Sequence, residues 1–157
     1  MIKTVIDAMN SKALAEKFYE KNNIKGVDIN KFYPQQAYLD MLRQISDQIG
    51  EATLSRIGEM IFENAKWPPG VNTLEKALTT VNDAYKMNHR GGEIGSYKLE
   101  KINDRTFKMI CDNPYPCAFD LGIMRGIAKK FGPATVRHAE GECRAKGGSK
   151  CSYTITV

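Results

Sequence analysis

Four side chains in the last third of the chain have the types and the spacing of ligands to a single metal ion. They are Cys117, Glu140, Cys143 and Cys151, at successive intervals of 23, 3 and 8 residues. Thiolates bind soft or borderline cations such as Zn²⁺, and a carboxylate can complete a tetrahedral set. Because four protein ligands leave no open coordination position, the pattern predicts a structural metal site rather than a catalytic one.

The residues alone leave alternatives open at this site. Glu142 is expected on the same side of its strand as Glu140, so a local bulge decides between the two carboxylates. His138 is near enough in the sequence to be a further ligand, or it is an exposed strand residue. Cys111 shares a predicted strand face with Phe107, which favours core packing over ligation. The cysteines could also all be ordinary buried thiols.

The spacing of the apolar side chains predicts the helices and strands that position these residues. The first half of the chain has the helical period, and the part after Arg90 largely alternates as strands do. Cys117 is expected at the start of a helix, where the helix dipole favours a thiolate. We expect helices over residues 11–22, 35–48, 52–65, 73–87 and 117–131, and strands over 94–101, 105–112, 134–142 and 151–157.

This order predicts an α+β fold, in which N-terminal helices pack on a four-stranded antiparallel sheet and one helix lies between two hairpins. The 157 residues fit a single domain. We divide it into a helical part, residues 1–90, that covers a pocket and forms a dimer contact, and a metal-stapled part, residues 91–157. Residues 1–9 fit a helix or a short strand.

Composition excludes several classes of protein. The hydrophobic fraction of 42% and the charged fraction of 26% are those of a soluble globular protein, and no apolar run is long enough to span a bilayer. Lys3 and Asp7 interrupt the start of the chain where a signal peptide would be apolar, so we expect a cytoplasmic protein. The net charge of +5 is scattered rather than gathered in a stripe, which argues against nucleic-acid binding.

The C-terminal part resembles a known family. Residues 117–132 and 140–155, with the pattern Glu-x-x-Cys-x-x-x-Gly-x-x-x-Cys from Glu140 to Cys151, are similar to the 4-vinyl reductase domain, also called the predicted hydrocarbon-binding domain. The likeness covers roughly residues 95–157. The same domain forms the aromatic-sensing module of phenol- and xylene-responsive activators, which bind Zn²⁺ through a cysteine, a glutamate and two further cysteines. The resemblance therefore implies zinc at the predicted ligands.

The resemblance also implies a fold and a partner. The family is similar in fold to subunits of vesicle-tethering complexes and, more distantly, to haem-based nitric-oxide sensors. These α+β folds enclose an apolar pocket, and several members dimerise through their N-terminal helices. We therefore expect a homodimer. No ATPase or DNA-binding segment follows the domain, so we expect it to stand alone rather than to control transcription directly.

A hydrophobic or aromatic small molecule is the ligand that this resemblance implies. The candidate lining residues all have aromatic or long apolar side chains and could equally be core residues: Trp67, Leu78, Tyr85, Tyr97, Phe107, Met109, Phe119 and Ile123. Trp67 and Tyr85 have polar tips that could orient a ligand. His89 could donate a hydrogen bond to a phenol-like ligand, bind haem iron, or be an exposed loop residue. The tyrosine–serine–arginine pattern that holds haem propionates in the nitric-oxide sensors is not found.

We therefore expect a binding or sensing module rather than an enzyme. The alternatives are an accessory subunit or enzyme that reduces a tetrapyrrole vinyl group, a haem- or tetrapyrrole-binding protein, and an assembly factor that dimerises through residues 35–66. A reductase would have to take its electrons from a partner, because the chain has no dinucleotide-binding glycine motif.

Overall fold

Helices come first along the chain and strands follow, as predicted. A computed structural model describes residues 2–28 and 30–157. The helices are α1 (Ile2–Met9), α2 (Lys12–Lys21), α3 (Gln35–Ile49), α4 (Glu51–Glu59), α5 (Ile61–Asn64), α6 (Leu74–Met87) and α7 (Cys117–Phe131), with a 3₁₀ turn at Arg144–Lys146. The strands are β1 (Ser96–Asn103), β2 (Thr106–Asp112), β3 (Thr135–His138) and β4 (Cys151–Thr156).

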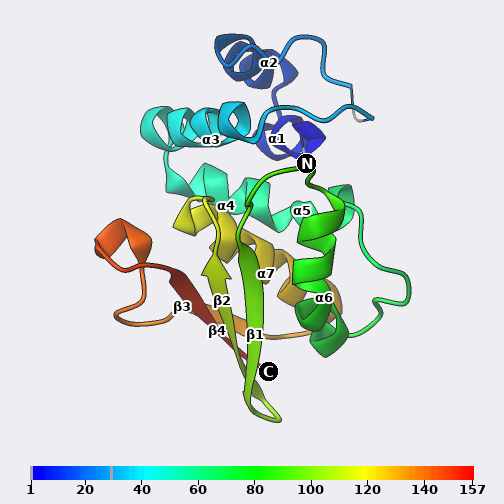
Figure 1. Cartoon of the computed structure of the whole chain (residues 1–157), viewed down its shortest axis with the longest axis vertical. Coiled ribbons are helices and arrows are strands. Elements are labelled where there is room, and N and C mark those ends of the chain that lie inside the picture. The colour runs from blue at the N-terminus through cyan, green and yellow to red at the C-terminus, as the bar shows by residue number, and fades with distance from the viewer. Residues whose placement is uncertain (1, 29) are drawn as a thin grey trace.

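The four strands form one antiparallel sheet in the order β1-β2-β4-β3. The pairing of β2 with β4 sets Cys111 opposite Cys151 and Met109 opposite Tyr153. The α+β prediction, with one helix between two strand pairs, is therefore confirmed. Figure 1 shows α1, α2 and α3 gathered at one end of the molecule and the sheet at the other.

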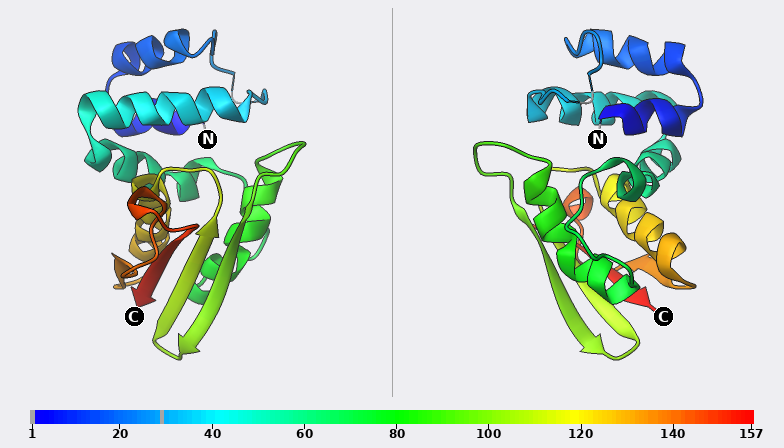
Figure 2. Two further views of the ribbon diagram at one scale, coloured as in Figure 1. Left: turned by 60° about the vertical axis from the view of Figure 1, so that its left-hand side comes forward. Right: turned by 90° about the vertical axis from the view of Figure 1, so that its right-hand side faces the viewer.

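Helix α7 occupies the centre of the fold. It packs against β3 and β4 of the sheet and also against α4, α5 and α6. The side views in Figure 2 show the N-terminal helices stacked above this unit, with α6 beside the sheet. Phe119, Met124 and Ile127 of α7 are buried, which accounts for the apolar stripe seen in the sequence.

Glycines allow α4 and α7 to approach closely. A Cβ atom on Gly122 would lie 2.1 Å from the carbonyl oxygen of Ser55, and one on Gly126 would lie 2.2 Å from that of Glu59. On the facing helix, a Cβ on Gly58 would lie 2.2 Å from the carbonyl oxygen of Phe119. No side chain fits at these three positions, so the two backbones are in direct contact.

Two predicted elements differ from the structure. The helix expected over residues 52–65 breaks at Met60 into α4 and α5. The strand expected over 134–142 ends at His138, although the Ala139 N–H still donates to the Ser152 carbonyl at 2.8 Å. Gly141 then turns the chain with a φ of 75°, a conformation that favours glycine.

Side chains cap the starts of two other helices. The Ser11 and Thr73 side chains accept hydrogen bonds from the N–H groups of Leu14 and Lys76, as N-cap residues do. The ambiguous start of the chain is helical from Ile2 to Met9.

Within residues 2–28 and 30–157, no helix combines the length and the apolar character needed to cross a bilayer. The division at residue 90 stays a prediction.

The glycine contact gives a direct test of this packing. Gly122→Ala should lower the free energy of unfolding by about 2 kcal/mol or more, because the added methyl group meets backbone rather than a movable side chain. Urea unfolding measures the change. Lys129→Ala, at an exposed position of the same helix, should stay within about 0.5 kcal/mol of the original. A Gly122→Ala protein as stable as the unmodified one would contradict the close packing of α4 on α7.

Candidate functional site

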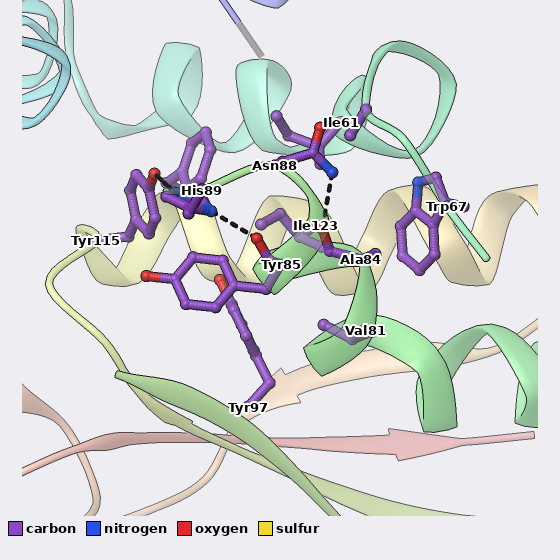
Figure 3. A pocket seen from close by; sticks show the side chains of 12 residues that line it. Ile61, Trp67, Val81, Ala84, Tyr85, Asn88, His89, Tyr97, Tyr115 and Ile123 are labelled. Carbon is purple, nitrogen blue, oxygen red and sulfur yellow. Dashed lines mark hydrogen bonds between the residues drawn. The ribbon is translucent and has the colours of Figure 1, made fainter. Parts of the chain in front are cut away.

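An apolar cavity lies between α6 and α7, below the connection from α5 to α6 (Figure 3). The space open to a water-sized molecule is about 30 Å³. Aromatic and aliphatic side chains make up nearly all of the wall. The lining residues are Ile61, Ala65, Trp67, Val81, Ala84, Tyr85, Asn88, His89, Tyr97, Tyr115, Phe119 and Ile123.

His89 is held on one wall by hydrogen bonds at both ring nitrogens (Figure 3). Nδ1 lies 2.6 Å from the Tyr85 carbonyl oxygen, which can only accept, so Nδ1 carries the proton. Nε2 lies 2.8 Å from the Tyr115 hydroxyl and accepts from it. Burial lowers the pKa of His89 below its usual value. The imidazole is therefore neutral at pH 7, and its hydrogen-bonding groups are already in use.

A buried carboxyl lies behind the cavity. Asp120 is fully buried and accepts a hydrogen bond from the Tyr97 hydroxyl at 2.7 Å. Arg144 Nη2 lies 3.4 Å from the same carboxylate, and Asn113 Nδ2 also lies at 3.4 Å. Burial raises the pKa of Asp120 to about 7, although these donors and the guanidinium oppose the rise. The carboxyl therefore titrates near neutral pH.

Six of the predicted ligand-binding residues share this cavity. Trp67, Tyr85, His89, Tyr97, Phe119 and Ile123 all line it. Phe107, Leu78 and Met109 do not and lie instead in the hydrophobic core.

Sequence reasoning missed two lining residues that have polar groups. Tyr115 was hidden in the proline-rich turn before α7, and Asn88 in the C-terminal cap of α6. An aromatic residue two positions before the start of a predicted helix was the signal that could have identified Tyr115.

A second cluster lies at the start of α7, away from the cavity. The ligand atoms of Cys117, His138, Cys143 and Cys151 all lie within 4.8 Å of one another. Cys117 Sγ is 2.9 Å from Cys151 Sγ and 3.6 Å from Cys143 Sγ. His138 Nε2 is buried and has no hydrogen-bond partner among the described residues. The predicted convergence of the three sulfurs is thus present, with an imidazole as the fourth group.

The Cys117 and Cys143 thiols of this cluster differ in the direction of their pKa shifts. Burial raises the pKa of the Cys117 thiol to about 12, and its contact with Cys151 adds to the rise. Burial acts in the same direction at Cys143, but the Cys117 thiol and the backbone N–H groups of Ala145 and Lys146 outweigh it and lower the pKa of Cys143. Negative charge is therefore favoured at Cys143 over Cys117.

Glu140 is not part of the cluster, contrary to the prediction. It is exposed in the turn that begins where β3 ends, because that strand is shorter than expected. The rival Glu142 lies near Lys108 Nζ, at 2.7 Å, and its carboxylate accepts from the Ser152 hydroxyl. Cys111 is buried in the core, as its strand face indicated. That the three sulfurs bind a cation stays a prediction.

Arg144 joins the cavity wall to the cluster. It follows Cys143 directly, and its guanidinium donates to the carbonyl oxygens of Cys111 and Tyr115, each at 2.7 Å. Tyr115 is separated from Cys117 by a single proline, so its ring lines the cavity while Cys117 lies in the cluster. The two sites therefore share one short, rigid stretch of chain.

Comparisons with known proteins identify the fold. No protein-family model matches the sequence, and no curated protein matches it. An H-NOX protein from S. oneidensis, solved in an Fe(II) ligation state, has a TM-score of 0.72 at 12% identity and covers 99% of this chain and 93% of its own. An H-NOX mutant from T. Tengcongensis has a TM-score of 0.71 at 15% identity, covering 99% of this chain and 92% of its own.

A third similar structure, from work on heme redox potential and porphyrin distortion, has a TM-score of 0.71 at 16% identity and covers 99% of this chain and 89% of its own. These likenesses extend over the helices as well as the sheet, and at such low identity they establish a shared fold.

These comparisons correct two predictions. The assignment to the 4-vinyl reductase family is wrong, because the similar structures are H-NOX proteins and match 99% of the chain. The pattern behind that assignment covered only the C-terminal part. Zinc as the cofactor is wrong on the same grounds, since the similar structures are described by Fe(II) and heme. The cysteine and histidine cluster alone is weak support for a metal.

The buried carboxyl predicts a pH dependence of stability. The pKa of Asp120 is about 7 in the folded protein and near 4 in an unfolded chain, so the folded state binds the extra proton between these values. This contribution to stability is complete below pH 4 and is lost as the pH rises through about 7. Asp120→Asn removes the titration. Between pH 5 and pH 8 the original protein should lose about 2 kcal/mol of unfolding free energy relative to this variant.

Urea unfolding of both proteins at several pH values measures the difference, in which the titration of other groups cancels. A difference that does not change between pH 5 and pH 8 would show that the Asp120 carboxyl stays ionised throughout.

Proposed function

We propose that the chain is a ligand-sensing domain that binds a small, mainly apolar molecule between α6 and α7. The observation that carries this proposal is the cavity itself, whose wall is almost wholly apolar and comes from α5, α6, β1, α7 and their connections. Concave, apolar sites with a few polar groups are the usual ligand sites of proteins. The shared fold supports a binding role, because the similar H-NOX proteins are described in complexes with ligands of their iron.

The size of the cavity limits the guest. One water molecule needs roughly 10–15 Å³ of such space, and the cavity offers about 30 Å³. A guest of a few non-hydrogen atoms fits this volume. Trp67 is only partly buried, so the wall on that side can yield to a somewhat larger guest.

Haem is the guest that the fold suggests, since the similar structures are described by Fe(II) and heme. The residues of the cavity do not fit that group in the packing seen here. A porphyrin far exceeds the available volume, and the Tyr115 hydroxyl occupies the His89 nitrogen that would bind iron. None of the lining residues is a lysine or arginine that could pair with the propionates. Haem binding nevertheless remains the second candidate, because the shared fold favours it.

Other features of the assignment stay predictions. The cytoplasmic location rests on the sequence alone, and so does a homodimer formed through residues 35–66. The four cysteines are free thiols in the structure. A vinyl-reductase role would need an electron donor from a partner, so we propose binding without turnover.

Titration with 2-methyl-1-butene tests the proposal. This small branched hydrocarbon should shift the methyl resonances of Ile61, Val81 and Ile123, which line the cavity. Ala84→Leu fills part of the cavity and should weaken binding by more than about tenfold. Ala52→Leu makes the same change at an exposed position of α4 and should leave binding unchanged.

Either of two results would contradict the proposal. The cavity methyl groups could fail to respond, or they could respond equally in the Ala84→Leu protein. Hemin serves as the second probe, and we expect no stoichiometric Soret band. A Soret band that disappears in His89→Ala would replace the small-guest proposal with the haem one.

A further inference from the structure

The Trp67 indole nitrogen is a buried hydrogen-bond donor on a side chain that lines the cavity. It has no partner among the described residues. Native proteins satisfy nearly all their buried donors, so each exception calls for an explanation, such as a catalytic role or a bound water or ion. Trp67 and His89 stand at opposite ends of the lining (Figure 3). The unpaired donor therefore lies away from the hydrogen-bonded histidine.

The position of this indole is fixed by its neighbours. The Lys66 N–H donates to Asn88 Oδ1 at 3.1 Å, and Asn88 Nδ2 donates to the Lys66 carbonyl at 2.8 Å. These two bonds fasten the residue before Trp67 to the end of α6. The Phe62 ring packs on the indole with a centroid separation of 4.7 Å. The donor is thus held in place at the cavity wall.

The other polar groups of the cavity already have partners. The Tyr85 hydroxyl donates to a backbone carbonyl, and the Tyr97 hydroxyl donates to the Asp120 carboxylate. The Tyr115 hydroxyl and the His89 ring pair with each other, as described above. The Asn88 amide is used by Lys66 and by the Ala84 carbonyl. Among the described residues that line the cavity, only the Trp67 N–H remains to recognise a polar atom of a guest.

We propose that Trp67 recognises a hydrogen-bond acceptor on the guest, and that the guest is a small apolar carbonyl compound such as a ketone or aldehyde. The inference rests on the proposed function and narrows its ligand class. The Tyr85, Tyr97 and Tyr115 hydroxyl protons are already donated within the protein, so among the described lining residues the indole N–H is the donor left for an acceptor on the guest. A carbonyl oxygen completes the hydrogen bond of the indole while its carbon skeleton contacts Ile61, Val81 and Ile123.

A matched pair of probes tests this inference. Butanone and 2-methyl-1-butene have nearly the same shape and differ in having an oxygen atom or a methylene group at the double bond. The chain contains a single tryptophan, so its spectrum has one indole N–H resonance. Butanone should move that proton downfield, and the alkene should not.

Substituting Trp67 separates the contribution of its hydrogen bond to the binding affinity from the free energy of removing a ketone from water. Trp67→Phe keeps an aromatic ring but has no donor. It should weaken butanone binding by about three- to tenfold and change alkene binding by less than about twofold. Phe131→Leu is the control, because Phe131 packs on Phe62 behind the indole but does not line the cavity. It should change neither affinity.

The outcomes separate this inference from the function on which it rests. If both probes bind and Trp67→Phe affects them equally, the acceptor recognition is wrong while the cavity remains a binding site. If the indole proton of the original protein does not respond to bound butanone, the inference is wrong even where Trp67→Phe fails to fold. If neither probe binds, the proposed function fails first and the inference fails with it.

Discussion

The close contact between α4 and α7 is the constraint on which the rest of the structure depends. Gly58, Gly122 and Gly126 leave no room for a side chain at the points of closest approach, so backbone atoms set the distance between the helices there. Backbone has no alternative rotamers, and such a contact cannot yield as a leucine interface can. It fixes the position of α7, and α7 in turn supplies Phe119 to the cavity and Cys117 to the sulfur cluster.

The start of α7 therefore has two environments within a few residues. On one side, Tyr115 and Phe119 stack with a centroid separation of 4.9 Å and face the apolar cavity. On the other, the Tyr153 hydroxyl donates to the Cys117 carbonyl at 2.7 Å and ties the helix start to β4 beside the sulfurs. Asp120 and Arg144 lie between the two environments, where burial raises the pKa of the Asp120 carboxyl to about 7 and the guanidinium opposes the rise. The two sites are therefore joined through the few residues at the start of α7.

Much of the fold could be predicted from the sequence, because the apolar residues of its helices and strands recur with the period of each element. The apolar stripe of residues 117–131 and the alternation around Phe107 are signals of burial, and they predicted α7 and β2 correctly. The convergence of Cys117, Cys143 and Cys151 was also predictable, since the start of α7, the loop that joins β3 to β4 and the start of β4 meet at one edge. These features depend on local sequence and on simple topology.

The failures have a different physical origin. Glu140 was placed wrongly because one glycine at 141 turns the chain early, and a strand pattern of alternating residues does not reveal where pairing stops. Tyr115 lies in a turn, so no period indicates that its ring faces His89. The family assignment failed because a short cysteine pattern reports a local cluster, whereas fold similarity reports the whole helical arrangement.

The cavity between α6 and α7 can be tested most directly by a crystal structure of the protein under xenon pressure. Xenon enters dry apolar cavities and is located by its anomalous scattering. We predict a xenon site enclosed by Ile61, Val81 and Ile123, beside the Trp67 indole. Side chains that fill this space and leave no xenon there would contradict it.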